Sequence, residues 1–436
     1  MKKTVNVGLI GFGTVGSGLA EVLLCQQERI AQRSGLTIRL SKVADISISH
    51  LPERFAAVQL TKNADELIND PEIDIIVELI GGIEPAKTFI LKAIAAGKHV
   101  VTANKALLSQ EGQEIFAAAA AKGVEVGFEA SVGGGIPLIK ALKEGLVANR
   151  ILSVMGILNG TANYILTRMT DECMPFAEVL KEAQQLGFAE ADPTYDVEGV
   201  DTAHKLAILM RIAFGMNITH SDIPTEGISN IEPVDINFAR EFGCRIKLLA
   251  VSHSLPNGEL EARVHPTMVP NSHPLASING AYNAVHFSGD MVGNVLLYGL
   301  GAGKLPTGSA VAADVVDIAR NIAANSVGRV PALSYLPEHI SEHRLAPPEE
   351  LRCPSYLRIT ALDKPGVLAN IAAILSRHGI SIESVLQKGR EENEPVGVVI
   401  LTHTASEAAQ ATALAEIDAL DTVTAPIVRI RMLGEE

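Results

Sequence analysis

The chain has 436 residues, of which 47% are hydrophobic and 20% charged, and its formal net charge at pH 7 is -14. This is ordinary globular composition, the length predicts two to four domains of ~100–200 residues, and the acidic balance argues against nucleic acid or an anionic membrane as partner. Four scattered cysteines without metal or redox spacing, and no apolar run of ~18 residues, indicate a soluble cytoplasmic protein.

The chain opens on a predicted strand over residues 4–10, which runs directly into a glycine loop and then a helical stretch to about Leu24. The six loop residues are Gly11, Phe12, Gly13, Thr14, Val15 and Gly16. Such glycines allow a tight turn and a close backbone approach, so that the helix start can face a pyrophosphate. A plain glycine turn is the alternative, but the strand, turn and helix together favour dinucleotide binding.

A second strand is predicted over residues 37–44 and ends at Asp45, the position that usually contacts the adenosine ribose. Asp45 lies further from Gly16 than the usual ~20 residues, which predicts a long helix or an insertion between them. An acidic residue here favours NAD and a nearby arginine favours NADP. Because Arg39 is upstream, the choice between the two cofactors stays open.

Further strands are predicted over residues 73–79, 99–102 and 124–128, with a helix over 85–96. Alternating strands and helices predict a doubly wound parallel sheet of the Rossmann type. Asn104 and Lys105 directly follow the strand 99–102, at the edge where such sheets bind ligands. We therefore expect Lys105 to contact a ligand, although a solvated lysine is the alternative.

A glycine-rich turn follows, with the sequence EASVGGGIP over residues 129–137. Exposed main-chain carbonyls and the Glu129 carboxylate are ligands suited to a hard cation. The turn could equally be a hinge between domains, and composition alone favours the hinge.

Longer helices separated by strands predict a second, α+β domain over residues 139–330 with its own sheet. A strand over residues 151–158 precedes Asn159, Gly160 and Thr161, which start a helix whose free amides could hold a carboxylate or could simply be capped. A later loop, Gly299–Gly303, opens a helix over residues 307–325. It suggests that the chain returns to the cofactor domain, although a packing turn is equally allowed.

The stretch from Leu186 to Met210 carries the strongest sign of chemistry. Asp201 and Lys205 are four residues apart on a helix that we predict over residues 201–216 with one buried face. Acidic residues in the preceding loop can fold back over the helix start; they are Glu190, Asp192 and Asp196. A lysine near carboxylates in a partly dry site is a candidate proton donor, and a solvated helix start is the alternative.

Residues 331–354 lack periodicity and read as a linker. The order βαββαβ over residues 355–436 predicts a ferredoxin-like domain without a plausible catalytic cluster.

Together these motifs resemble homoserine dehydrogenases of the single-function type with a C-terminal ACT domain, over nearly the whole chain and in order. The matching stretches are GFGTVG, TANK, EASVGGGIP, NGTANYI, LGFAEADPTYDVEGVDTAHKLAIL, GLGAG and DKPGVLANIA. The stretch around Lys205 and TANK are the specific ones, since the first glycine loop occurs in many dehydrogenases. Leu300 stands where the family usually has proline, a departure that we expect to be harmless.

The resemblance implies reversible, NAD(P)H-dependent conversion of L-aspartate 4-semialdehyde to L-homoserine, in threonine, methionine and isoleucine biosynthesis. Lys205 would donate the proton, Asp201 would keep it charged and oriented, and Lys105 would assist at the substrate or the cofactor amide. Because a neighbouring carboxylate favours the charged lysine, reduction suits neutral pH and oxidation should improve as pH rises.

Other residues take their expected roles from the same resemblance. Substrate contacts fall on Glu190, Asp201, Gly160, Thr161 and Asp196. Cofactor contacts fall on Gly11, Phe12, Gly13, Thr14, Val15, Gly16, Asp45, Asn104, Lys105, Gly187 and Gly303. A monovalent cation, sodium in the family, would lie at Glu129, Val132, Gly134 and Ile136. A threonine effector would lie near Asp363, Gly366 and Asn370.

The resemblance also implies a homodimer built on the sheet of the second domain, or a homotetramer if the ACT domains pair. Two rival functions remain open at this point. One is a related NAD(P)-dependent semialdehyde or sugar reductase, and the other is a non-enzymatic amino-acid sensor. A purely structural role of the ACT domain in assembly is also open.

Overall fold

The computed structural model describes residues 3–341, 344–388 and 394–434, which fold into two compact units. The first unit comprises Met1–Gly160, Val200–Ile223 and Ala281–His343. The second unit comprises Thr161–Gly199, Pro224–Gly280 and Arg344–Glu436. Residues 342–343 of the predicted linker lie outside the described residues.

The first unit contains a parallel sheet of order β3-β2-β1-β4-β5-β6. Its strands are β1 (Thr4–Ile10), β2 (Thr37–Ala44), β3 (Gln59–Thr61), β4 (Ile75–Glu78), β5 (His99–Thr102) and β6 (Val126–Gly127). The strand order reverses between β1 and β4, which places a ligand crevice at the carboxyl ends of these strands. The predicted doubly wound sheet is confirmed.

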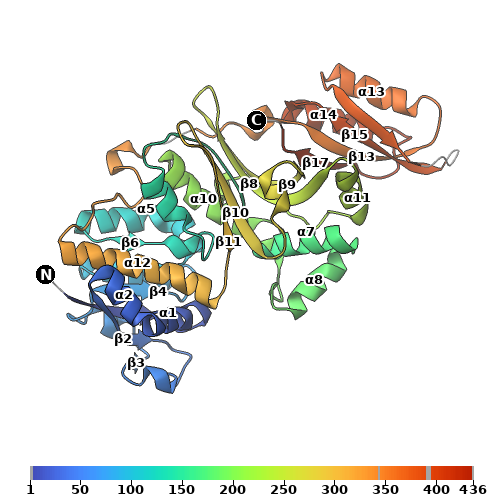
Figure 1. Ribbon diagram of the computed structural model, residues 1–436. Coiled ribbons are helices and arrows are strands. Elements are labelled where there is room, and N and C mark those ends of the chain that lie inside the picture. Colours follow the sequence, from blue (N-terminus) through green and yellow to red (C-terminus); the bar gives the residue numbers. More distant parts are fainter. Residues whose placement is uncertain (1–2, 342–343, 389–393, 435–436) are drawn as a thin grey trace. The chain divides into compact units, whose positions relative to one another are not determined.

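Helices cover both faces of this sheet, as the alternating pattern requires. They are α1 (Thr14–Cys25), α2 (Gln27–Ser34), α3 (Asp65–Ile68), α4 (Ala86–Ala95), α5 (Lys105–Lys122) and α12 (Lys304–Ala324). The short helix α6 (Leu138–Lys140) packs instead against the turn Glu129–Ser131. The separate helix α2 accounts for the long interval between Gly16 and Asp45. Helix α12 lies alongside α1 (Figure 1), where a Cβ atom on Gly18 would come within 2.1 Å of the Lys304 carbonyl oxygen. Val311 and Val315 of α12 are therefore part of the core of the parallel sheet.

The rest of the first unit surrounds one long helix, α10 (Val200–Phe214). Three antiparallel strands of order β11-β10-β7 belong to it: β7 (Ile151–Ile157), β10 (Tyr282–Gly289) and β11 (Gly293–Leu300). The prediction of a single buried face on α10 is wrong, because every residue from Asp201 to Phe214 is buried. Helix α5 and strand β7 pack against it, and Arg211 of α10 donates a hydrogen bond to the Leu108 carbonyl of α5.

The second unit begins with helices α7 (Gly160–Glu172), α8 (Phe176–Gln185) and α9 (Thr194–Val197), of which α7 starts at the last residue of the first unit. Helix α11 (Pro233–Glu241) packs on β8 (Cys244–Ser254), which pairs antiparallel with β9 (Leu260–Pro270).

The C-terminal part of this unit has its own hydrophobic core and an antiparallel sheet of order β17-β13-β15-β14. Its elements are β13 (Ser355–Leu362), α13 (Val367–Arg377), β14 (Ile382–Gln387), β15 (Pro395–Thr402), α14 (Glu407–Asp418) and β17 (Val428–Met432). Short strands β12 (Arg352–Cys353) and β16 (Ala405–Ser406) pair beside it. The predicted ferredoxin-like order is confirmed, and β17 also pairs parallel with β9.

Across residues 3–341, 344–388 and 394–434, no helix is both long and apolar enough to cross a membrane.

Candidate active site

Asp201, the second residue of α10, organises the centre of the site. Its side chain is buried, and its Oδ2 atom accepts a hydrogen bond of 2.7 Å from Nζ of Lys205, one helical turn later. The Lys205 ammonium also donates to the main-chain carbonyl oxygen of Leu158, over 2.7 Å. Two acceptors thus fix the position of a buried ammonium, which is a geometry suited to proton donation.

A second lysine reaches the same carboxylate from another helix. Lys105, the first residue of α5, places its Nζ atom 2.9 Å from Oδ1 of Asp201. The side-chain amide of Asn159 donates to Oδ2 of Asp201, over 2.9 Å. The structure therefore brings together the three residues predicted to be catalytic, Lys205, Asp201 and Lys105.

The charges around Asp201 keep it ionised. Burial alone would raise its pKa, but Lys205 and Lys105 hold the pKa well below the ordinary value of an aspartate. Two ammonium groups thus contact one buried carboxylate, and the Lys205 ammonium is itself buried. Ammonium groups held in this way stabilise negative charge that develops on a carbonyl oxygen.

Arg211 locks the two helices that carry these residues. Its buried guanidinium donates from Nη1 to the carbonyl oxygen of Leu108 (2.6 Å) and from Nη2 to that of Ser109 (2.9 Å), both on α5. A Cβ atom on Gly112 would lie 2.6 Å from Nη1, so glycine makes room for this contact. Burial lowers the pKa of Arg211 to about 10, and the group therefore remains charged at neutral pH.

Next to this clamp, two histidines stack at the α5–α10 interface. The rings of His204 and His220 are 3.8 Å apart, and the Ser109 hydroxyl lies 2.8 Å from Nδ1 of His204. Burial, together with the neighbouring His220, lowers the pKa of His204 to about 4. His204 is thus neutral at physiological pH and adds no charge beside Lys205.

Asn283 was not among the residues predicted from the sequence. It lies on β10, and its side-chain amide donates to the Leu158 carbonyl over 2.8 Å, the same carbonyl that Lys205 uses. The pairing of β10 with β7 brings Asn283 beside Leu158. No local motif marks Asn283 or Arg211, since both act through the packing of distant segments.

The glycine loop has the shape that a dinucleotide needs. Gly11 has a φ angle of 96°, and a Cβ atom on Gly16 would lie 2.1 Å from the Gly11 carbonyl oxygen. Gly13 precedes α1 and supplies no side-chain cap to it. The amides at the start of α1 therefore suit a pyrophosphate, and the two close approaches require glycine.

Asp45 is tied to this loop. Its Oδ2 atom accepts from the main-chain N–H of Phe12 (2.7 Å), and Oδ1 accepts from the N–H and the hydroxyl of Ser47. Although burial opposes it, these hydrogen bonds lower the pKa of Asp45. A fixed negative charge therefore stands at the end of β2, where a ribose is expected.

Two other predicted cofactor residues lie at ends of elements in the first unit. The Asn104 side chain caps α5 and donates to the carbonyl oxygen of Gly82 over 2.6 Å, which joins the loops after β4 and β5. Gly303, with a φ angle of 130°, precedes α12. Gly187, in contrast, ends α8 in the second unit.

The loop predicted to bind a cation uses its carboxylate for the fold. Glu129 accepts hydrogen bonds from the N–H groups of Ile139 (2.8 Å) and Lys140 (2.9 Å), and burial raises its pKa. Main-chain carbonyls are thus the oxygens best suited to a cation here. No cluster of three or more His, Cys, Asp or Glu suited to a metal occurs in the described part of the chain.

The remaining predicted substrate residues, Glu190, Thr161 and Asp196, belong to the second unit, whereas Gly160 ends a segment of the first. Thr161 donates its hydroxyl hydrogen to the Phe188 carbonyl (2.6 Å), and Gln184 donates to the Glu190 carbonyl (3.1 Å). These contacts hold the acidic segment against α7 and α8.

The predicted effector residues cluster at the turn between β13 and α13. Asp363 accepts from the Gln387 side chain over 3.3 Å. Gly366, with a φ angle of 91°, precedes α13, and its carbonyl accepts from the N–H of Asn370.

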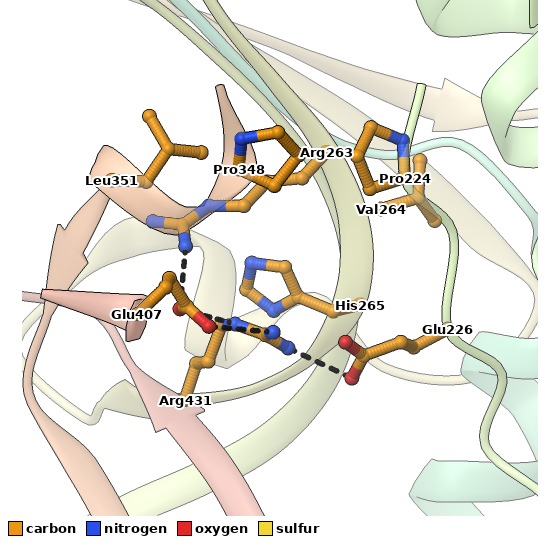
Figure 2. Close-up of a pocket in the computed structure, with 9 residues that line it drawn as sticks. All are labelled: Pro224, Glu226, Arg263, Val264, His265, Pro348, Leu351, Glu407 and Arg431. Atoms are coloured by element: carbon orange, nitrogen blue, oxygen red, sulfur yellow. Dashed lines mark hydrogen bonds and ion pairs between the residues drawn. The ribbon is translucent and has the colours of Figure 1, made fainter. Parts of the chain in front are cut away.

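A group of ion pairs joins the ferredoxin-like domain to the rest of the second unit (Figure 2). Glu407, the first residue of α14, accepts hydrogen bonds from Arg263 on β9 and from Arg429 and Arg431 on β17. Arg431 also contacts Glu226 over 2.7 Å. Burial opposes ionisation, but the arginines hold the pKa of Glu407 well below its ordinary range.

A parallel sheet of order 3-2-1-4-5-6, a glycine loop facing a helix start and a buried ammonium centre define a nicotinamide-dependent dehydrogenase. Family models match in three parts: "Homoserine dehydrogenase, NAD binding domain" over residues 11–129, "Homoserine dehydrogenase" over residues 137–316 and "ACT domain" over residues 355–422. The chain belongs to the homoserine dehydrogenase family and is an NAD(P)-dependent oxidoreductase.

Similar proteins agree along the whole length. A homoserine dehydrogenase of Neisseria gonorrhoeae is 48% identical over 430 residues, which cover 99% of each chain. The structure of a homoserine dehydrogenase from Thiobacillus denitrificans has a TM-score of 0.94 at 49% identity, over 99% of each chain. A hyperthermophilic archaeal homoserine dehydrogenase in complex with NADPH is 25% identical, with a TM-score of 0.60 over 72% of this chain and 98% of that one.

Proposed function

We propose that the chain catalyses the reversible reduction of L-aspartate 4-semialdehyde to L-homoserine with NADPH or NADH, in the synthesis of threonine, methionine and isoleucine. The observation that supports this most directly is the buried Asp201 between Lys205 and Lys105. Carbonyl reduction needs positive charge and a proton donor beside the developing oxyanion, and this arrangement offers both.

When bound, the nicotinamide cofactor supplies a hydride to the aldehyde carbon. Lys205 polarises the aldehyde oxygen and then protonates it, while Asp201 and the Leu158 carbonyl hold the ammonium in place. Lys105 is a second positive charge beside the same Asp201 carboxylate. It assists at the substrate or at the cofactor amide. In the oxidative direction Lys205 accepts the alcohol proton and must first be neutral.

The ligand contacts that we propose follow the family resemblance. The amides from Gly11 to Gly16 receive the pyrophosphate, and Asp45 contacts the adenosine ribose. Asn104, Lys105, Gly187 and Gly303 complete the cofactor site. Glu190 binds the substrate ammonium, with Gly160, Thr161, Asp196 and Asp201 around the substrate.

A monovalent cation, sodium by family resemblance, binds the carbonyl-rich loop at Glu129, Val132, Gly134 and Ile136. Both carboxylate oxygens of Glu129 accept main-chain N–H groups, so its main-chain carbonyl is the more suitable ligand. Positive φ angles at Gly133 and Gly134 turn the chain sharply there, which glycine allows.

Threonine is the effector that we propose for the ACT domain, at Asp363, Gly366 and Asn370. The ion pairs of Glu407 and the β17–β9 pairing support a route from this domain to β9 and the segment at Glu226. From there the N–H of Ile228 donates to the Val197 carbonyl over 2.8 Å, next to the acidic substrate segment. A role in assembly alone predicts no effect of threonine on the rate.

A homodimer through the edge strand β11 is the assembly that we propose, with ACT pairing as the route to a tetramer. Tyr298 and Leu300 on this strand are 64% and 47% exposed. An edge strand with exposed apolar side chains is a template for pairing with a second copy. Sedimentation velocity distinguishes monomer, dimer and tetramer.

The deciding experiment is initial-rate oxidation of L-homoserine with NAD and NADP separately, with and without threonine. Turnover establishes the reaction and ranks the cofactors, and inhibition by threonine assigns the ACT domain its regulatory role. A folded sample that oxidises homoserine with neither cofactor, at neutral or alkaline pH, contradicts the proposal in favour of another reductase or a sensor.

A further inference from the structure

One carbonyl group serves two donors at the centre of the site. The oxygen of Leu158 accepts from Lys205 Nζ over 2.7 Å and from Asn283 Nδ2 over 2.8 Å. A carbonyl oxygen has two lone pairs, and these two donors can therefore occupy one each. The side chain of Asn283 thus restricts the direction from which Lys205 approaches Leu158.

Asn283 is itself held rigidly. The residue is 1% exposed, and a Cβ atom on Gly301 would lie 2.2 Å from its Cγ atom. The loop that carries Gly301 is packed in turn against the glycine-rich turn, since a Cβ atom on Gly134 would lie 2.3 Å from the Gly301 carbonyl oxygen. Two glycine-rich loops therefore fix the plane of the Asn283 amide.

An amide side chain at residue 283 has a feature that packing alone does not explain. Its Oδ1 atom is buried and has no hydrogen-bond partner among the described residues. A buried acceptor without a partner is unfavourable, so stability alone does not account for the amide. What the amide provides is an uncharged donor to the Leu158 carbonyl, which an aspartate or a leucine would not.

We propose that Asn283 is a positioning residue for proton transfer, which occupies one lone pair of the Leu158 carbonyl and thereby sets the direction in which Lys205 presents its ammonium. The inference rests on the proposed function only for its kinetic consequences. The position and the titration of Lys205 can be measured without any substrate.

The charges facing Lys205 within the first unit define the expected pH effect. Asp201 lies on the same helix, Lys105 reaches the shared carboxylate from α5, and the neighbouring His204 is neutral. Asn283→Asp adds a second carboxylate next to the Leu158 carbonyl. An added negative charge favours the charged lysine, so Lys205 loses its proton at higher pH than in the wild type.

Two variants test the inference. Asn283→Asp should move the alkaline rise of homoserine oxidation, which needs neutral Lys205, up by about one pH unit. Asn283→Leu keeps the size but removes the donor. It should lower kcat about tenfold, leave the KM for the cofactor within about twofold and increase the solvent deuterium effect on kcat. Lys205 can also be labelled with a small amine-reactive reagent at a series of pH values, and the labelling read by peptide mass spectrometry. In Asn283→Asp, labelling of Lys205 should begin at higher pH than in the wild type, without any substrate present.

Asn321→Leu is the matched control. This buried asparagine of α12 contacts Glu125 and Arg329, in the same unit but outside the proposed site. Its loss should lower the unfolding temperature and leave the pH profile and Lys205 labelling unchanged. The inference would be overturned if both Asn283 variants folded and had the same pH profiles and labelling curves as the wild type. Failure of the wild type to oxidise homoserine would overturn only the proposed function, because the labelling result stands independently.

Discussion

The Nζ atom of Lys105 lies 2.9 Å from Oδ1 of Asp201, so α5, which connects β5 and β6 of the parallel sheet, shares an ion pair with α10, the helix that carries Lys205. Lys105 starts α5 at the carboxyl end of β5, where a dinucleotide is expected, and Asp201 is the second residue of α10. One carboxylate therefore sets the position of the proton donor relative to the cofactor edge. Changes at Asp201 should therefore affect both Lys205, the proton donor, and Lys105, at the edge where the cofactor is expected.

Lys205→Ala should lower kcat for homoserine oxidation by ~100-fold or more, since it removes the group that exchanges the proton. Cofactor affinity should be nearly unchanged, because Lys205 contacts Asp201 and Leu158 and lies away from the glycine loop. Stopped-flow kinetics and fluorescence titration with NADPH measure the two quantities. Lys92→Ala, at an exposed ion pair, is the control; only a mild loss in Lys205→Ala would remove the assignment as proton donor.

Asp201→Asn should destabilise the fold at pH 7 by about 3–5 kcal/mol, because it removes the buried carboxylate charge that both ammonium groups contact. The pKa of Asp201 is depressed by folding, so its stabilisation is complete above its ordinary pKa of about 4 and is lost as pH falls further towards the folded-state pKa. Urea unfolding from pH 7 to pH 3 should show a constant gap between wild type and variant that narrows only below about pH 4. A gap that is the same at every pH would contradict the depressed pKa.

Arg211→Met should loosen α5 from α10 and so disturb the Lys105–Asp201 pair. We expect a lower kcat as well as a loss of stability of about 2–4 kcal/mol, since buried carbonyls lose a charged donor. Arg211→Lys keeps the charge but lacks the planar guanidinium that donates from Nε, Nη1 and Nη2 to three carbonyls, and should fall between wild type and Arg211→Met. Thermal unfolding and kcat on the folded fraction are the measurements, and a kcat equal to that of the wild type would show that the clamp is structural only.

Features encoded by short-range spacing could be predicted from the sequence. The glycine loop before α1 and the Asp201–Lys205 pair depend on residues within six positions of one another, and both are found as predicted. The βαββαβ order of the C-terminal domain follows likewise from local periodicity. The separate helix α2 was not predicted as such; the sequence indicated only a long helix or an insertion between Gly16 and Asp45.

Features that depend on packing between distant segments could not be predicted. The full burial of α10 arises because α5 and β7 cover it, and its sequence shows only part of that environment. Asn283 reaches Leu158 through strand pairing, and Arg211 reaches α5 through space that Gly112 leaves open. Strand β11 has a weak burial pattern, with both partly buried and exposed positions, and was therefore not predicted.

Glu407→Gln should weaken the contact between the ACT domain and β9. The carboxylate accepts hydrogen bonds from three arginines, so its neutralisation leaves buried positive charge and should cost about 3–5 kcal/mol in stability. Because folding lowers the pKa of Glu407, the wild type should lose this advantage as pH falls below about 4. The basal rate should change little, since Glu407 lies outside the residues assigned to substrate and cofactor.

Inhibition by threonine is the sensitive readout of this variant. If Glu407 couples the ACT domain to the segment at Glu226, the threonine concentration for half-inhibition should rise several-fold, while threonine binding measured by calorimetry should remain. Glu416→Gln on α14 is the matched control, because its ion pairs are exposed and should contribute at most about 1 kcal/mol. Equal threonine sensitivity in wild type, Glu407→Gln and Glu416→Gln would place the coupling elsewhere. The second contact between the domains, Asp235 of α11 with Tyr356 and Arg358 of β13, would then be the next to test.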